Sequence, residues 1–140
     1  MTAPLYTRDI LRLAAAIPHL VRFEEVHEQD EMRSPTCGAR VRVAVGLDQE
    51  GRVASLVQAV EACAFGQAAA GLMGADALDK SREEVVDAIA GISAWLAGDD
   101  GAMTSWPGLA VLDPARARRG RHGAILLPFR ALLAAIEKAT

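Results

Sequence analysis

Two alternating segments joined by a short polar turn constrain the fold of this 140-residue chain more than any other feature. Residues 40–47 alternate, with Val41, Val43 and Val45 on one face and Arg40, Arg42 and Ala44 on the other. A period of two is that of a half-buried β-strand. After a turn at residues 48–51, residues 52–60 are expected to return with Val53, Ser55 and Val57 on one face and Ala54, Leu56 and Val60 on the other. The two segments therefore predict a β-hairpin.

Most of the remaining chain has helical periodicity. The pattern predicts helices over residues 7–16, 65–78, 81–96 and about 124–138, and at most one short strand near residues 28–34. Ser81 and Glu84 match a capping box, and Pro128 is expected near the first turn of the last helix, where a missing N–H is tolerated. Residues 98–121 form a polar connection with one apolar segment at 109–112. The order of these predicted helices and strands along the chain indicates an α+β fold, in which a three-stranded antiparallel sheet is packed against several helices.

Charge and hydropathy exclude several classes of protein. The net charge of −3 gives no strongly basic surface for nucleic acid. Apolar runs end well short of the roughly 20 residues that span a bilayer, and the first ten residues do not resemble a signal peptide. Two cysteines do not make a secreted disulfide framework. We expect one cytoplasmic domain over residues 1–140, without nucleic-acid or membrane partners.

Three side chains could carry chemistry: Cys37, Cys63 and His122. Cys37 precedes the first hairpin strand and Cys63 follows the second, so antiparallel pairing should bring both thiols to one end of the sheet. Cys63 also precedes a helix, whose N-terminus favours the thiolate that binds iron or zinc. The alternative is that both thiols are buried apolar groups and that His122 is an ordinary loop residue. The basic run Arg116, Arg118, Arg119 and Arg121 is either a solvated loop or a site for a partner or an anion.

Three motifs resemble one protein family. Ser-Pro-Thr-Cys-Gly at residues 34–38 is close to the Asn-Pro-X-Cys-Gly motif of the IscU/SufU/NifU-type iron–sulfur cluster scaffolds. Cys63 lies at a strand-to-helix junction and is followed, as in that family, by a helix rich in small residues. The pair His122-Gly123 stands where the family has His-Cys or Lys-Cys. The resemblance covers residues 5–138, and the long connection at 98–121 is similar to the insertion of the SufU branch.

This resemblance implies a function and a set of ligands. In that family a cysteine desulfurase supplies sulfur, and the cluster passes to iron–sulfur acceptor proteins. It implies a scaffold or carrier that binds iron, zinc or a [2Fe–2S] cluster through Cys37, Cys63 and His122. The chain would be a monomer or a weak homodimer, because two thiols are half of a Cys₄ site that two protomers could share. Two family ligands are missing: Ala39 replaces the common aspartate, and Gly123 replaces the third cysteine.

Two other functions remain open from the sequence. The fold could serve as an interaction module of the assembly machinery that binds no cluster. It could also be a persulfide-transferring thiol enzyme, which needs a base beside the nucleophilic cysteine, and His122 is the candidate for that base. We assign no catalytic residue. We predict that Cys37, Cys63 and His122 converge at one end of the sheet.

Overall fold

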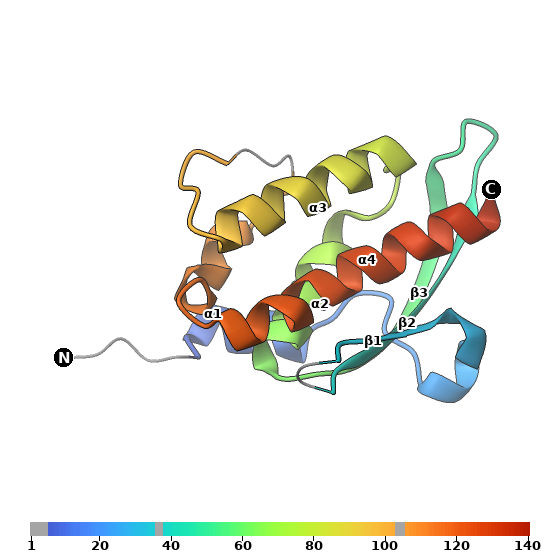
Figure 1. The fold of residues 1–140 in the computed structure, drawn as a ribbon. Helices are drawn as coiled ribbons and strands as arrows, with labels where there is room; N and C mark the ends of the chain where they lie inside the picture. The colour runs from blue at the N-terminus through green and yellow to red at the C-terminus, as the bar shows by residue number, and fades with distance from the viewer. Residues whose placement is uncertain (1–5, 36–37, 103–105) are drawn as a thin grey trace.

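The structure is a computed structural model that describes residues 6–35, 38–102 and 106–140. Its elements are α1 (Arg8–Ala15), β1 (Glu31–Arg33), β2 (Arg40–Leu47), β3 (Val53–Glu61), α2 (Ala64–Asp76), α3 (Arg82–Leu96) and α4 (His122–Ala139), with 3₁₀ helices η1 (Phe23–Glu25), η2 (Glu28–Asp30), η3 (Leu109–Ala115) and η4 (Arg119–Arg121) (Figure 1). The α+β class and the three-stranded antiparallel sheet are confirmed. No helix in the described part of the chain is both long and apolar enough to cross a membrane.

The sheet has the order β1-β2-β3, and a bulge changes which residues of β3 face the core. Gly46 pairs with Ser55 and Leu47 pairs with Val53, so one extra residue of β3 lies between these pairs. An extra residue reverses the alternation of side chains beyond it. Val53 and Leu56 are therefore both buried, while Ser55 is exposed. The sequence pattern placed Val53 on the face of Ser55 and Val57, and that assignment is wrong.

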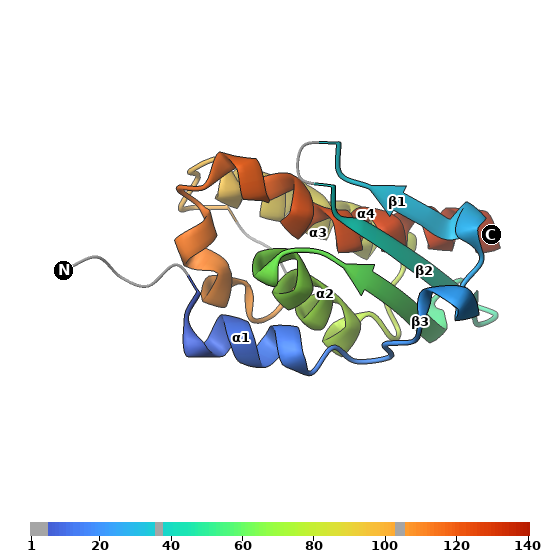
Figure 2. The same ribbon diagram turned by 90° about the horizontal axis from the view of Figure 1, so that it is seen from below.

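Helix α4 connects the sheet to the other helices. It packs against β2 on one side, and both α2 and α3 pack against it. Helix α1 in turn packs against α2 (Figures 1 and 2). The centre of this core is formed by fully buried side chains, among them Val41, Phe65, Met73, Phe129 and Ile136. In the long connection before α4, Trp106 Nε1 donates a hydrogen bond to Leu72 O at 2.8 Å. The connection is thereby anchored to α2.

Glycines allow α2 to approach its neighbours closely. A Cβ atom added at Gly71 would lie 2.8 Å from Leu13 O of α1, and one added at Gly74 would lie 2.6 Å from Gln58 Nε2 of β3. Real Cβ atoms do not approach other heavy atoms this closely, because cores are packed to near crystal density. The glycines therefore fix where α1 and β3 lie against α2.

Helix α4 begins two residues earlier than the sequence pattern indicates. Because it starts at His122, Pro128 lies in its second turn and not near the first turn as predicted. A proline there has no N–H to donate to the carbonyl four residues before it, which is that of Ala124. This carbonyl faces α2, since a Cβ atom added at Gly66 would lie 3.3 Å from Ala124 O. The earlier start is favoured by η4, which leads directly into the helix.

A buried glutamine ties three segments together. Gln58 of β3 is fully buried, and its Nε2 donates to Pro18 O at 3.0 Å and to Ala70 O at 3.1 Å. Its backbone N–H donates to His19 O at 3.0 Å, and its carbonyl accepts from Val21 N at 2.8 Å. The segment that follows α1 is thus fixed along β3.

The predicted capping box at the start of α3 is present and has a consequence for pH. Glu84 N donates to Ser81 Oγ, and Glu84 Oε1 accepts from Ser81 N at 3.2 Å and from Arg52 Nη1 at 2.8 Å. The Ser81 backbone N–H, followed by the Arg52 guanidinium, lowers the pKa of Glu84 below its ordinary value. A carboxyl with a lowered pKa in the folded state stabilises the fold at neutral pH, and this contribution is lost as pH falls through the lowered pKa.

We expect Glu84→Gln to lower the free energy of unfolding at about pH 7 by less than about 1 kcal/mol, because the ion pair is partly exposed. Glutamine keeps the capping hydrogen bond, so the variant and the wild type should converge near about pH 3. Urea denaturation at both pH values measures the difference. Glu83→Gln is the control, since Glu83 is exposed in the same turn and makes no ion pair among the residues described. An equal loss of unfolding free energy at both pH values would contradict a stabilising contribution from the lowered pKa of Glu84.

Candidate functional site

Cys63 lies between the sheet and α2, as the sequence predicts. It is the N-cap residue of α2, two residues after the last residue of β3, with an extended backbone (φ −65°, ψ 171°). Its thiol is free and half-buried at the edge of the core, and makes no capping hydrogen bond. The first N–H groups of a helix lack partners within the helix, and Cys63 stands beside those of α2.

Cys37 lies outside the described residues, so its distance from Cys63 stays a prediction. The residues around it form the loop between β1 and β2. Ser34 N donates to Ala39 O at 2.9 Å, and Gly38 N donates to Ser34 O at 3.1 Å. Gly38 has φ +72°, a conformation that glycine adopts without strain. These hydrogen bonds fix the two ends of the loop.

The strand register shows where this loop lies relative to Cys63. Arg40, at the start of β2, is paired with Arg33 on one side and with Glu61 on the other. The loop before Arg40 and the segment after Glu61 therefore leave the sheet at the same end (Figure 2). This register supports the convergence that was predicted for the two cysteine segments.

Ion pairs hold the three strands together at that end. Glu31 of β1 accepts from Arg33 Nε at 2.6 Å, from Arg42 Nε at 3.0 Å and from Arg40 Nη1 at 3.3 Å. Arg40 Nη2 also donates to Glu61 Oε2 at 2.8 Å. The hydrogen bond from Arg33, followed by that from Arg42, lowers the pKa of Glu31. The carboxylate thus stays charged, and the network fixes the strand ends from which both cysteine segments leave.

His122 is the first residue of α4, and its ring is held by the connection before the helix. Its Nε2 lies 3.0 Å from Ala115 O and 3.1 Å from Arg116 O. Carbonyl oxygens only accept hydrogen bonds, so Nε2 carries a proton and Nδ1 is the nitrogen left to act as a base or ligand. The ring lines a hollow of about 470 Å³ together with Leu96 and Arg119.

Gly123, the next residue, borders a different hollow. That hollow has a volume of about 300 Å³ and is also lined by Ser34 and Pro35, the residues before the Cys37 loop. The position where the resembled family has its third cysteine is thus on the side of the Cys37 loop. His122 and Gly123, although adjacent in sequence, line different cavities.

The starts of α2 and α4 are in contact. A Cβ atom added at Gly66 of α2 would lie 3.4 Å from Ala124 Cβ of α4. The helix that begins after Cys63 and the helix that begins with His122 therefore meet at their first turns.

The described donor set does not complete a metal site. Among the residues that the structure places, no group of three His, Cys, Asp or Glu side chains could hold a metal ion. Ala39 is buried and offers no donor, and Gly123 has no side chain. Cys63 and His122 therefore need Cys37, solvent or a second chain to complete a coordination shell.

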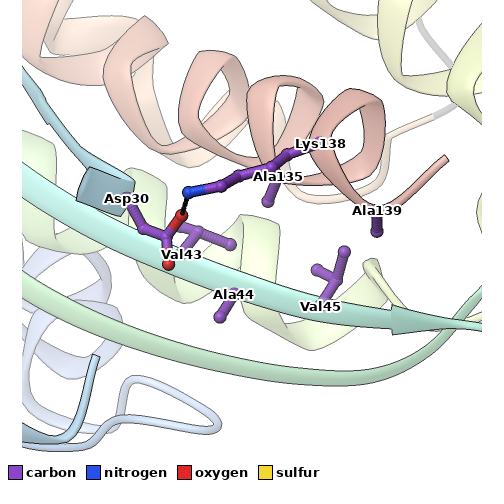
Figure 3. Close-up of a pocket in the computed structure, with 7 residues that line it drawn as sticks. All are labelled: Asp30, Val43, Ala44, Val45, Ala135, Lys138 and Ala139. Carbon is purple, nitrogen blue, oxygen red and sulfur yellow. Dashed lines mark hydrogen bonds and ion pairs between the residues drawn. The ribbon is translucent and has the colours of Figure 1, made fainter. Parts of the chain in front are cut away.

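A third hollow lies near the opposite end of α4. Figure 3 shows Lys138 reaching from α4 to Asp30, and its Nζ lies 2.7 Å from Asp30 Oδ1. The hollow has a volume of about 180 Å³ and is otherwise lined by Val43, Val45 and alanines. Its charged groups are paired with each other, so it offers no candidate chemistry.

The sequence reasoning missed two arginines at the Gly123 hollow. Arg33 and Arg130 line it together with Arg119, which belonged to the basic run noted in the sequence. Gly123 and Arg130 are seven positions apart, which is about two helical turns. Helical periodicity would therefore have placed both residues on one face of the last helix. No local signal marks Arg33, because its approach depends on how β1 lies against α4.

Solved structures share this fold. The crystal structure of a nitrogen-fixing NifU-like protein (N-terminal) from Brucella abortus matches with a TM-score of 0.79 and 24% identity, covering 96% of this chain and 94% of that chain. A structure described as an iron–sulfur cluster assembly scaffold protein for the SUF system, from Fervidobacterium islandicum AW-1, has a TM-score of 0.77 and 18% identity over 94% and 96% of the two chains. A crystal structure of a hypothetical protein has a TM-score of 0.78 and 22% identity over 95% and 97%. No protein-family model matches the sequence, and no curated protein matches it.

Proposed function

We propose that residues 1–140 form one scaffold or carrier domain of the IscU/SufU/NifU type, which holds iron or a [2Fe–2S] cluster as cargo in the cytoplasm. The observation that carries the proposal is Cys63 at the N-terminus of α2, at the end of the sheet from which the Cys37 loop also leaves. A fold shared with two structures described as NifU-like and as a SUF-system scaffold supports it.

The proposed ligands are Cys63, Cys37 and His122. Cys63 would bind as a thiolate, which is the form that ligates a metal, so binding releases its proton. His122 would bind through Nδ1, because Nε2–H donates to the carbonyls of Ala115 and Arg116. Such a carbonyl partner fixes the tautomer and orientation of a metal-binding imidazole.

The missing donors at positions 39 and 123 affect how cargo would be held. Two thiols per chain are half of a Cys₄ set, so a cluster bridging two protomers would satisfy four positions. In a single chain, the incomplete ligand set would leave one coordination position of zinc or iron open. The metal would then bind weakly and could exchange with another protein. The proposed partners are therefore a cysteine desulfurase, which supplies sulfur, and acceptor proteins that receive the cluster.

Anaerobic reconstitution with iron, cysteine and a cysteine desulfurase tests this function. We expect the wild type to gain visible absorbance together with iron and acid-labile sulfide. Cys63→Ser and Cys37→Ser should each abolish the gain, because the donor set falls to one thiol. His122→Gln should lower it, while His27→Gln, which changes an exposed histidine of the segment between α1 and β1, should not. Unchanged cargo in both cysteine variants would remove the proposal.

An adaptor function is the second candidate, and the incomplete donor set favours it. Ala39 and Gly123 supply no ligand, and the described residues hold no three-donor group. An adaptor would stay colourless in the same reconstitution and show no zinc binding by isothermal titration, while still binding the desulfurase. The two outcomes separate the candidates.

A further inference from the structure

The hollow beside Gly123 is lined by arginines from three elements. Arg33 ends β1, Arg119 begins η4 and Arg130 lies on α4, and all three line the same space of about 300 Å³. Ser34 and Leu127 also line it, and no lining residue is acidic. We call this hollow the arginine pocket. Arg119 and Arg130 belong to consecutive elements, whereas Arg33 is distant in sequence, so the fold brings Arg33 to the other two.

Two of these arginines have no carboxylate partner. Seven of the thirteen arginines form an ion pair with a described residue, for example Arg52 with Glu84 and Arg82 with Glu137. The side chains of Arg119 and Arg130 make no ion pair or hydrogen bond with any residue that the structure describes. Arg33 uses its Nε to bind Glu31. Cations held around one hollow repel each other, and a bound anion removes that repulsion.

The charge of the pocket is local. The whole chain has a net charge of −3, so a cationic hollow is not a consequence of its composition. Gly123, Leu127 and Arg130 recur at the spacing of one helix face, which places Arg130 on the same face of α4 as Gly123, about two turns later. The guanidinium group binds phosphate and carboxylate through two parallel hydrogen bonds.

We propose that the arginine pocket binds a small multivalent oxyanion that carries phosphate or several carboxylates. The volume is at the lower end of the range for small-molecule sites, which favours a compact anion over a peptide. The anion would lie beside the loop that carries Cys37. This binding does not depend on cluster or metal binding, so the two proposals can fail separately.

Amide NMR titration of the intact protein tests the proposal with inorganic phosphate and with citrate, at an ionic strength kept constant with chloride. We expect saturable shifts at Gly123, Leu127 and Arg130. Arg119→Gln and Arg130→Gln should each weaken binding roughly tenfold, as expected for one charge-assisted hydrogen bond. The tighter of the two probes identifies the preferred group. Arg8→Gln is the matched control, because Arg8 is exposed on α1, far in sequence from the pocket, and makes no ion pair with a described residue.

Three results would overturn the proposal. The first is shifts no larger than those caused by chloride alone. The second is an equal loss in Arg8→Gln, which would indicate general electrostatic attraction. The third is binding of a short polyglutamate peptide in the absence of phosphate and citrate binding, which would make the surface a docking site for an acidic protein. The arginines that are changed are exposed, so unchanged thermal unfolding should confirm that each variant is folded.

Discussion

Gly123→Cys is expected to tighten the binding of zinc or of a cluster by roughly 100-fold. Structural zinc sites with four protein ligands have binding free energies of about 10 to 16 kcal/mol, so one added thiolate contributes about 3 kcal/mol. Gly123 is half-buried in the first turn of α4 and borders the hollow that Ser34 and Pro35 also line. A cysteine there adds a thiol on the side of the Cys37 loop. Isothermal titration with zinc and anaerobic reconstitution measure the change.

Gly120→Cys is the matched control for this gain. A Cβ atom at Gly120 has nothing within 4 Å, and the residue is exposed in η4, three positions before Gly123. It adds a thiol nearby without bordering the hollow. If the protein is a scaffold, the wild type already accepts a cluster and Gly123→Cys holds it more tightly. If it is an adaptor, only Gly123→Cys gains colour. Equal gains in both variants would show that the effect is not specific to position 123. No cluster in the wild type or in Gly123→Cys, while the fold is intact, would show that no ligand pocket remains.

Gly71→Val is expected to lower the melting temperature by roughly 10 °C. A Cβ atom at this position would lie 2.8 Å from Leu13 O and 3.4 Å from Leu13 C, which are backbone atoms that cannot rotate away. Helix α1 must therefore move, at a cost of about 3 kcal/mol for overpacking. The gain in helix propensity over glycine is well below about 1 kcal/mol and does not offset this. For a chain of this size each kcal/mol lowers the melting temperature by roughly 3 °C.

Thermal denaturation followed by circular dichroism measures this change, with Gly120→Val as the control. The open surroundings of Gly120 predict a change within about 0.5 kcal/mol. A melting temperature that falls equally in both variants would mean that the contact between α1 and α2 does not limit stability. A fall confined to Gly71→Val would assign the cost to that contact.

The elements that the sequence predicts well are those whose signals are local. The period-two pattern of β2 and the capping box at Ser81 each involve residues within a few positions, and both appear as predicted. The bulge near Ala54 depends on pairing across the hairpin, so no pattern within β3 alone predicts it. Gln58 is polar and would be expected outside, but carbonyls of Pro18 and Ala70 give it buried partners. Such burial depends on segments that the sequence does not place.

The candidate site also combines features that the local sequence predicts with features that depend on tertiary packing. The position of Cys63 follows from where β3 ends and α2 begins, which the change from alternating to helical periodicity marks. The hydrogen bonds of the His122 ring depend on the path of the connection through Ala115 and Arg116, which has no regular pattern. The meeting of Arg33 with Arg130 depends on tertiary packing. The convergence of Cys37 with Cys63 and His122 stays a prediction, because Cys37 lies outside the residues described.

The proline inside α4 lies between two parts of the helix that are both packed in the core. Without an N–H at Pro128, one hydrogen bond between the first turn and the rest of the helix is absent. The part after Pro128 is held by core residues such as Phe129, Leu132 and Ile136, which are fully or almost fully buried. The part before Pro128 is buried as deeply, with Ala124 and Ile125 fully or almost fully inaccessible, so packing against α2 holds the helix where this hydrogen bond is absent.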